Sequence, residues 1–168
     1  MIKQIKSSEI KNFIENNPKT VLLDVRTDNE WKTVGLRMKQ HCSNAEKVVS
    51  FLETQKKVTN VIYPTNHQGE IKERAKKYMQ GGYGSLVGMD VGTKEAGAKF
   101  IDNLKMLYHV ANIGDARSLA IHPATTTHSQ LDDAALAAAG VTPGYVRLSI
   151  GIEHPDDIIA DIKQALAA

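Results

Sequence analysis

The chain has 168 residues, 42% of them apolar and 24% charged, which is typical of a globular protein of one domain or one domain with an extension. Its 21 Lys and Arg against 19 Asp and Glu leave a formal charge of +2 without a basic cluster, which argues against nucleic-acid binding. The single cysteine, Cys42, excludes an intramolecular disulfide, and no apolar run is long enough to span a membrane. We therefore expect a soluble, cytoplasmic protein that binds neither nucleic acid nor membrane.

Residues 1–35 are expected to contain a helix, a strand and a junction. Ser7 can cap a short helix that ends at Asn16-Asn17-Pro18. Val21-Leu22-Leu23 then has the apolar character of a buried strand. Thr27 to Gly35 is polar and turn-like, and we expect the domain boundary there.

Alternating helices and strands are predicted after this junction. A helix over Arg37–Leu52 is indicated by apolar residues at spacings of four and three: Met38, Cys42, Ala45, Val49 and Leu52. The next predicted elements are a strand over Val58–Tyr63, a charged helix over Gly69–Tyr78, a strand over Ser85–Val91 and a helix over Glu95–Leu107, whose inward residues are Ala98, Ile101 and Leu104.

The last part of the chain continues the alternation. Val110 to His122 is extended, and Ser129 or Asp132 caps a short alanine-rich helix that ends at Gly140. Tyr145 to Ile152 alternates as a strand does, with Val146, Leu148, Ile150 and Ile152 on one face and Tyr145, Arg147, Ser149 and Gly151 on the other. Pro155 begins the final helix. This order predicts an α/β fold in which helices pack on one sheet.

Arg147 is the most informative single residue. It lies in the middle of an otherwise apolar strand, where a guanidinium is costly unless it meets an anion. Its planar fork matches a carboxylate, so a ligand carboxylate is one candidate. A structural ion pair with Asp115, Glu153 or another acid is the alternative, and the residues alone leave both open.

Two stretches, Ala111–His128 and Gly140–His154, resemble the Cys/Met-metabolism family of PLP-dependent enzymes, in particular its O-acetylhomoserine sulfhydrylase branch. Arg37–Leu52 fits the same branch. The resemblance implies that residues 36–168 form the C-terminal small domain of a fold-type I PLP enzyme. That domain has a mostly antiparallel or mixed four-stranded sheet with helices packed on one side.

The resemblance also implies a substrate site. Arg147 would hold the α-carboxylate of the amino-acid substrate, Asn112 would lie beside the same carboxylate, and Thr127 would line the pocket. From the residues alone, Asn112 can equally be a turn residue and Thr127 a helix-entry residue. His122 and His128 are not spaced as metal ligands on one helix face, and we expect no metal site.

The catalytic groups of the family are expected to be absent from this chain. The resemblance places the PLP lysine, the phosphate cradle and the acid facing the pyridine nitrogen in a large upstream domain. Lys94, Lys99 and Lys105 have the pattern of helix-surface lysines. We therefore expect no catalytic and no cofactor-binding residue here, and no activity of the chain alone. A surface that the large domain would otherwise cover could form a homo-oligomer.

Met1 to Trp31 resembles the start of a rhodanese domain, in the segments SSEIKNFIENNP and VLLDVRTDNEW. A sulfurtransferase would need a low-pKa cysteine at the head of a loop of backbone amides. Cys42 follows Asp24 too closely and lies on the apolar stripe of its helix, which favours a buried structural thiol. We expect a rhodanese-like fragment fused to a sulfhydrylase domain. A rhodanese-like sulfurtransferase and a non-catalytic interaction or oligomerisation module are the alternatives.

Overall fold

The computed structural model describes residues 28–168, and side chains from Val34 onward except at position 133. The chain divides into two compact units, Met1–Lys32 and Thr33–Ala168. The elements from Thr33 onward belong to the second unit, and helix α2 begins before its boundary, at Asp28. The predicted helix after Ser7 and the predicted strand Val21–Leu23 lie outside the described residues.

A five-stranded mixed sheet forms the centre of the unit, in the order β1-β2-β5-β4-β3. The pairs β1–β2, β2–β5 and β5–β4 are antiparallel, and β4–β3 is parallel. The strands are β1 (Asn60–Ile62), β2 (Leu86–Asp90), β3 (Tyr108–His109), β4 (Leu119–Ile121) and β5 (Tyr145–Ser149). The expected number of four strands is wrong because β3 has only two residues, too few to produce a periodic pattern.

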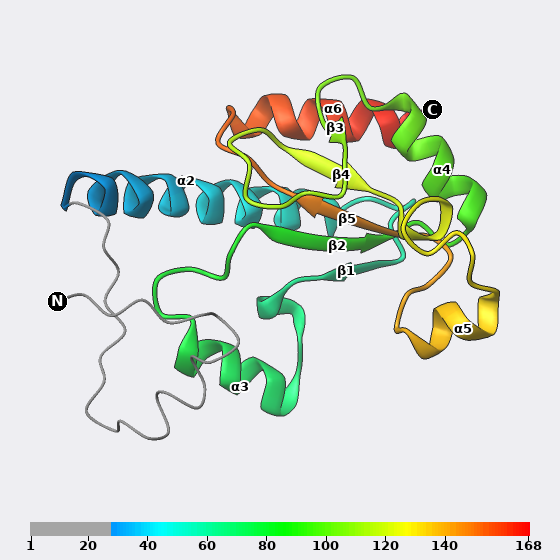
Figure 1. Cartoon of the computed structure of the whole chain (residues 1–168), viewed down its shortest axis with the longest axis horizontal. Coiled ribbons are helices and arrows are strands. Elements are labelled where there is room, and N and C mark those ends of the chain that lie inside the picture. The colour runs from blue at the N-terminus through cyan, green and yellow to red at the C-terminus, as the bar shows by residue number, and fades with distance from the viewer. Residues whose placement is uncertain (1–27) are drawn as a thin grey trace, which may run out of the picture. The chain divides into compact units, whose positions relative to one another are not determined.

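The helices alternate with these strands as the sequence predicts, except that β3 and β4 follow one another without a helix between them (Figure 1). Thr93 caps one of them by accepting a hydrogen bond from the Ala96 amide, and Asp132 caps another by accepting one from Ala135. The bounds are α2 (Asp28–Leu52), α3 (Gly69–Tyr78), α4 (Lys94–Asn103), α5 (Asp133–Ala138) and α6 (Pro155–Ala167), with short 3-10 helices η2 (Pro64–Asn66) and η3 (Pro123–Thr125). None of these helices is long and apolar enough to cross a membrane.

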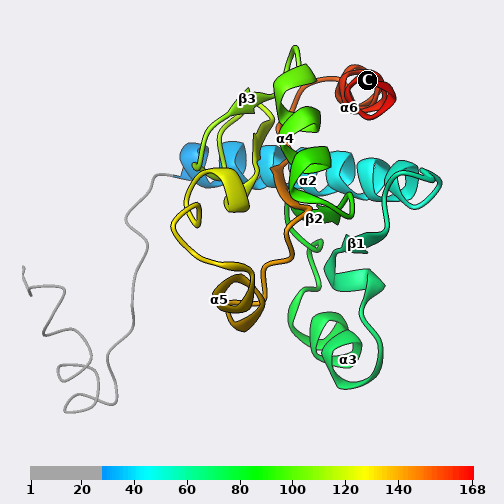
Figure 2. The same ribbon diagram turned by 90° about the vertical axis from the view of Figure 1, so that its right-hand side faces the viewer.

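The core lies on one face of the sheet. Helices α2, α4 and α6 supply buried side chains to a single apolar cluster with one face of β2, β4 and β5. Its strand residues are Val87, Met89, Ala120, Val146 and Leu148, and its helix residues include Val48, Leu52, Phe100, Ile158 and Ile162. By contrast, α3 buries no residue, and both views show α3 and α5 on the side of the sheet away from α6 (Figures 1 and 2). The opposite face of β5, which carries Arg147, is therefore left without a layer of core helices.

Helix α2 begins earlier than the composition predicts. It starts at Asp28, so Asp28–Gly35 is helical where the polar residues predict a turn-like junction. This segment has no proline to break a helix, and most of its residues are compatible with one. Met38 is 45% exposed, whereas the buried part of the helix begins at His41.

Helix α4 ends earlier than predicted, at Asn103 rather than Leu107. The cause is a tertiary contact. The amides of Lys105, Met106 and Leu107 donate to the carboxylate of Asp161 on α6, at 2.8–3.0 Å, so they are not available to continue the helix.

Candidate functional site

Arg147 lies on the face of β5 opposite the core, and no described carboxylate forms an ion pair with it. Its Nη2 donates hydrogen bonds to the backbone carbonyls of Ala111, at 2.9 Å, and Asn112, at 3.2 Å. Its Nε is buried and finds no partner among the described residues. The structural ion pair with Asp115 or Glu153, which the sequence leaves open, is therefore not formed. Because no described acid neutralises it, the guanidinium is able to bind the anionic group of a ligand.

A pocket of about 210 Å³ opens beside Arg147. It lies over β1, β2 and β5, and Ile62, His67, Leu86 and Tyr145 contribute to its lining. The Tyr145 ring lies so close to Gly88 that a Cβ there would come within 2.7 Å of it. Burial raises the pKa of Tyr145, so its hydroxyl remains a neutral donor and acceptor. The pocket thus combines apolar walls with a charged guanidinium.

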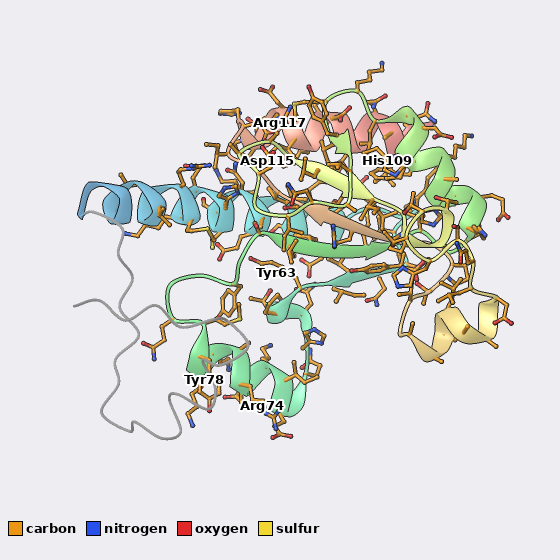
Figure 3. All side chains as sticks on the ribbon, in the orientation of Figure 1. Tyr63, Arg74, Tyr78, His109, Asp115 and Arg117 are labelled. Atoms are coloured by element: carbon orange, nitrogen blue, oxygen red, sulfur yellow. The ribbon has the colours of Figure 1, made fainter. Side chains whose placement is uncertain are left out.

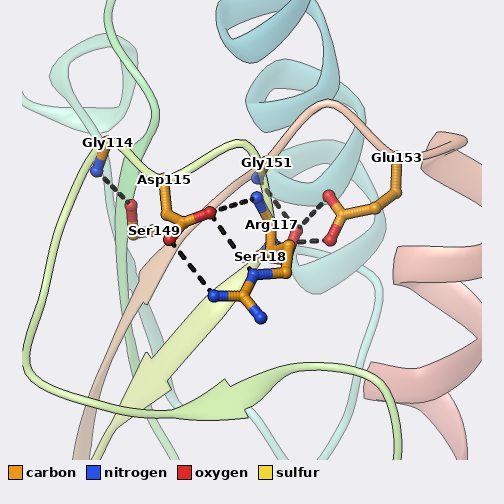
Figure 4. Close-up of polar contacts among 7 residues, drawn as sticks. All are labelled: Gly114, Asp115, Arg117, Ser118, Ser149, Gly151 and Glu153. Atoms are coloured by element: carbon orange, nitrogen blue, oxygen red, sulfur yellow. Dashed lines mark hydrogen bonds and ion pairs between the residues drawn. The ribbon is translucent and has the colours of Figure 1, made fainter.

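The loop from Ala111 to Ser118 supplies the carbonyls that bind Arg147, and alternate residues after Arg147 hold this loop (Figure 4). The Ser149 hydroxyl accepts from the Gly114 amide at 3.2 Å. The Glu153 carboxylate accepts from the amide of Ser118 at 2.6 Å and from its hydroxyl at 2.9 Å. The face alternation of Tyr145–Ile152 indicated Arg147, Ser149 and Gly151 but not Glu153, and the partners of all four, 33 to 36 residues away, gave no sequence signal.

Asp115 and Arg117 belong to the same loop, above β4 in the view of Figure 3. The Arg117 backbone amide and then its guanidinium hold the pKa of Asp115 below its usual range. The guanidinium of Arg117 lies 4.4 Å from the centre of the Tyr108 ring, a cation–π contact. Asp115 is therefore occupied by Arg117 and not by Arg147.

The three residues predicted to hold substrate are placed differently. Asn112 contacts Arg147 through its backbone carbonyl, while its side chain accepts from the Ile113 amide at 2.9 Å, as a turn residue does. The hydroxyl of Thr127 is exposed and bonds to Nδ1 of His128 at 2.8 Å. The contacts described here bring Asn112 to Arg147 but do not link Thr127 to either.

His122 is a buried structural residue. Its Nε2 donates to the Pro143 carbonyl at 2.8 Å, and its Nδ1 lies 2.9 Å from the Thr125 hydroxyl. Burial lowers the pKa of His122, which favours the neutral form of the ring. No group of three or more potential metal ligands occurs between residues 28 and 168.

Cys42 is a buried free thiol on α2, 8% exposed. It packs so closely on Gly82 that a Cβ there would lie 2.8 Å from its Sγ. Such a thiol has no access to a sulfur donor in the folded chain. This burial is the opposite of what a sulfurtransferase needs.

Comparisons with known proteins confirm the resemblance to the Cys/Met-metabolism family. The family model described as "Cys/Met metabolism PLP-dependent enzyme" matches residues 9–167. O-acetyl-L-homoserine sulfhydrylase of Leptospira meyeri is 48% identical over 80% of this chain and 31% of its own length. Sulfhydrylase FUB7 of Fusarium oxysporum is 44% identical, again over 80% of this chain and 31% of the relative. The chain therefore spans about a third of the length of the curated relatives that it matches.

A solved structure shares the fold. The putative O-acetylhomoserine (thiol)-lyase of Campylobacter jejuni, described with N'-pyridoxyl-lysine-5'-monophosphate, superposes with a TM-score of 0.74 at 39% identity. The similarity covers 81% of this chain and 32% of that one. The family model, the curated relatives and the solved structure therefore indicate the same family. The chain belongs to the Cys/Met metabolism family of PLP-dependent enzymes.

Proposed function

We propose that residues 36–168 are the C-terminal domain of an O-acetylhomoserine sulfhydrylase and hold the α-carboxylate of its amino-acid substrate. The observation that carries this proposal is the Arg147 guanidinium, which no described acid neutralises and which borders a pocket. In a complete enzyme, the reaction would replace the acetate of O-acetylhomoserine by a sulfur nucleophile. Arg147 would orient the substrate, aided by Asn112 and Thr127.

The affinity of this chain alone should be low. One charge-assisted contact contributes about 1.5–3 kcal/mol. Without further contacts, this corresponds to a Kd on the order of 10–100 mM. Binding must therefore be measured by a method that detects weak ligands.

An NMR titration of the full chain tests the role of Arg147. We expect L-homoserine to shift the Arg147 Nε–Hε resonance and the amides of Ala111–Gly114. L-homoserinamide, which lacks the carboxylate, should leave them unchanged at the same ionic strength, and Arg147→Gln should abolish the response. Equal shifts with the amide, or no shift with the acid at about 100 mM, would refute carboxylate binding.

The described lysines do not fit the cofactor of the family. A lysine that holds PLP must reach into an enclosed site, and PLP would supply the electron sink for chemistry at the substrate's carbons. Every lysine from Lys39 to Lys163 is exposed except Lys72, which is half-buried, and no lysine lines the pocket at Arg147. We therefore propose that these 168 residues alone do not bind PLP at one site and do not catalyse the exchange.

Chemical trapping tests this second part of the proposal. The chain is mixed with PLP, reduced with borohydride and mapped by mass spectrometry. We expect low labelling spread over the exposed lysines. Labelling concentrated on one lysine, and lost when that lysine is replaced by arginine, would contradict the proposal.

We also propose that residues 1–35 are a rhodanese-like fragment and junction, and that a second copy of the chain covers the open sheet face in solution. Ile62 and Leu86, 37% and 43% exposed, lie on that face near Arg147. Sedimentation at several concentrations would compare the full chain with one that begins at Arg37. If both chains stay monomeric at every concentration, the second copy does not cover this face.

A further inference from the structure

We propose that Glu153 is a positioning residue for Arg147, acting through the Ala111–Ser118 loop. This inference rests on the proposed role of Arg147 as a carboxylate anchor. It assigns a function to a residue whose side chain does not itself contact the guanidinium in the structure.

Among the residues that the structure describes, no charged partner fixes the orientation of the Arg147 guanidinium. Its Nη2 donates to neutral carbonyls, those of Ala111 and Asn112. The direction of the guanidinium therefore depends on where the loop places these carbonyls. If Arg147 binds a carboxylate in a defined geometry, the loop that orients the guanidinium must be rigid.

Glu153 makes the charge-assisted attachment of that loop. Both carboxylate oxygens accept from Ser118, one from the amide at 2.6 Å and the other from the hydroxyl at 2.9 Å. Ser118 is fully buried, and its hydroxyl also accepts from the Gly151 amide at 2.9 Å. Hydrogen bonds to an ionised acceptor are stronger than neutral ones, such as the bond from Gly114 to Ser149.

Glu153 is half-buried, and Gly151 and helix α2 restrict its position. A Cβ on Gly151 would lie 2.2 Å from Oε2 of Glu153 and 2.4 Å from the Ala116 carbonyl, so only glycine allows this approach. From α2, Asn44 donates to the carbonyls of Gly151, at 3.0 Å, and Glu153, at 2.8 Å. Nδ1 of His41 lies 2.7 Å from the Ile150 carbonyl. The backbone that carries Glu153 is therefore fixed to α2, and the carboxylate of Glu153 holds the loop through Ser118.

The test measures solvent exchange of the Arg147 Hε proton by NMR in the full chain, without ligand. Nε is buried, so this proton exchanges slowly while the loop keeps its place. We expect Glu153→Gln to accelerate the exchange by about tenfold, the effect of losing one bond to a charged group. Ser118→Ala removes the same attachment from the other side and should act similarly, which covers the case that one variant does not fold.

Ile162→Ala is the matched control. This residue is fully buried on α6, and its truncation lowers global stability without touching the loop. If Glu153→Gln and Ser118→Ala exchange no faster than this control at equal fractions folded, the inference is overturned. Because no ligand is present, this result is independent of the homoserine titration. A failed titration with faster exchange would refute only the carboxylate role.

Discussion

The carboxylate of Asp161 should contribute a large part of the stability of the unit. It lies on α6, 6% exposed, and accepts from the amides of Lys105, Met106 and Leu107 at 2.8–3.0 Å. It also accepts from the side chain of Gln164 at 3.0 Å. This one side chain therefore joins α6 to the segment that follows α4.

Asp161→Asn keeps the shape of the side chain but replaces the charged carboxylate, with two acceptor oxygens, by an amide with one. At least one of the three amides then loses its partner, and the remaining bonds lose their charge assistance. Hydrogen bonds to charged groups contribute about 1.5–3 kcal/mol each and do not add fully, so we expect a loss of about 2–4 kcal/mol. For a unit of this size, the melting temperature should fall by roughly 8–16 °C.

The loss should depend on pH. Burial raises the pKa of Asp161, but the backbone amides of Leu107, Lys105 and Met106 and the Gln164 side chain outweigh it, so the pKa lies below the ordinary 3.8. A lowered folded-state pKa means that the stabilisation is complete above the unfolded value and is lost as pH falls through the folded one. The native chain and the variant should therefore differ most near neutral pH and converge in acid.

Urea unfolding followed by far-UV circular dichroism measures this difference at pH 7 and at a series of lower values. Asp102→Asn, an exposed aspartate on α4, is the control and should change stability by less than about 0.5 kcal/mol. A difference below about 0.5 kcal/mol for Asp161→Asn at pH 7 would refute the reasoning. So would a difference that stays constant down to the acid transition.

Three further predictions follow from close packing and burial. Gly97→Ala would place a Cβ 2.4 Å from Nε2 of His122, so the free energy of unfolding, measured by thermal unfolding, should fall by about 1–3 kcal/mol. Gly35 is a helical site with nothing within 4 Å, so Gly35→Ala should raise the free energy of unfolding by about 0.5–1 kcal/mol. Equal effects at the two sites would contradict this packing argument. The thiol of Cys42 should react with Ellman's reagent only after unfolding, and fast labelling of the folded chain would show that it is accessible. Because burial lowers the pKa of His122, its ring should stay neutral below pH 6.5 in an NMR titration, and the free energy of unfolding should decrease as pH falls below that value. An ordinary titration of His122 near pH 6.5 would refute the predicted neutral ring.

Local chemistry was sufficient for several elements. The bounds of α3 match the prediction at both ends, Gly69 and Tyr78, and Pro155 begins α6 as its fixed φ suggests. Asp132, one of two candidates, is the cap of α5. Strict alternation in Tyr145–Ile152 predicted which residues of β5 face the core, because successive side chains of a strand point to opposite faces.

Other features depended on contacts that are distant in the sequence. Helix α4 ends because the amides that follow it donate to the carboxylate of Asp161. Strand β3 exists only because it pairs with β4. Neither partner lies within the local window that periodicity can read. The same holds for Thr127, whose place in a substrate pocket rests on the resemblance alone.

Arg147 shows most clearly which features follow from the local sequence and which depend on the tertiary structure. The sequence alone determined that a guanidinium stands on the non-core face of an apolar strand, because a side-chain period of two is a local property. Only the tertiary structure decided its partners, the carbonyls of Ala111 and Asn112 rather than Asp115 or Glu153. The reason is physical: those acids are already engaged by Arg117 and Ser118, and the loop that brings the carbonyls to Arg147 is placed by hydrogen bonds across more than 30 residues.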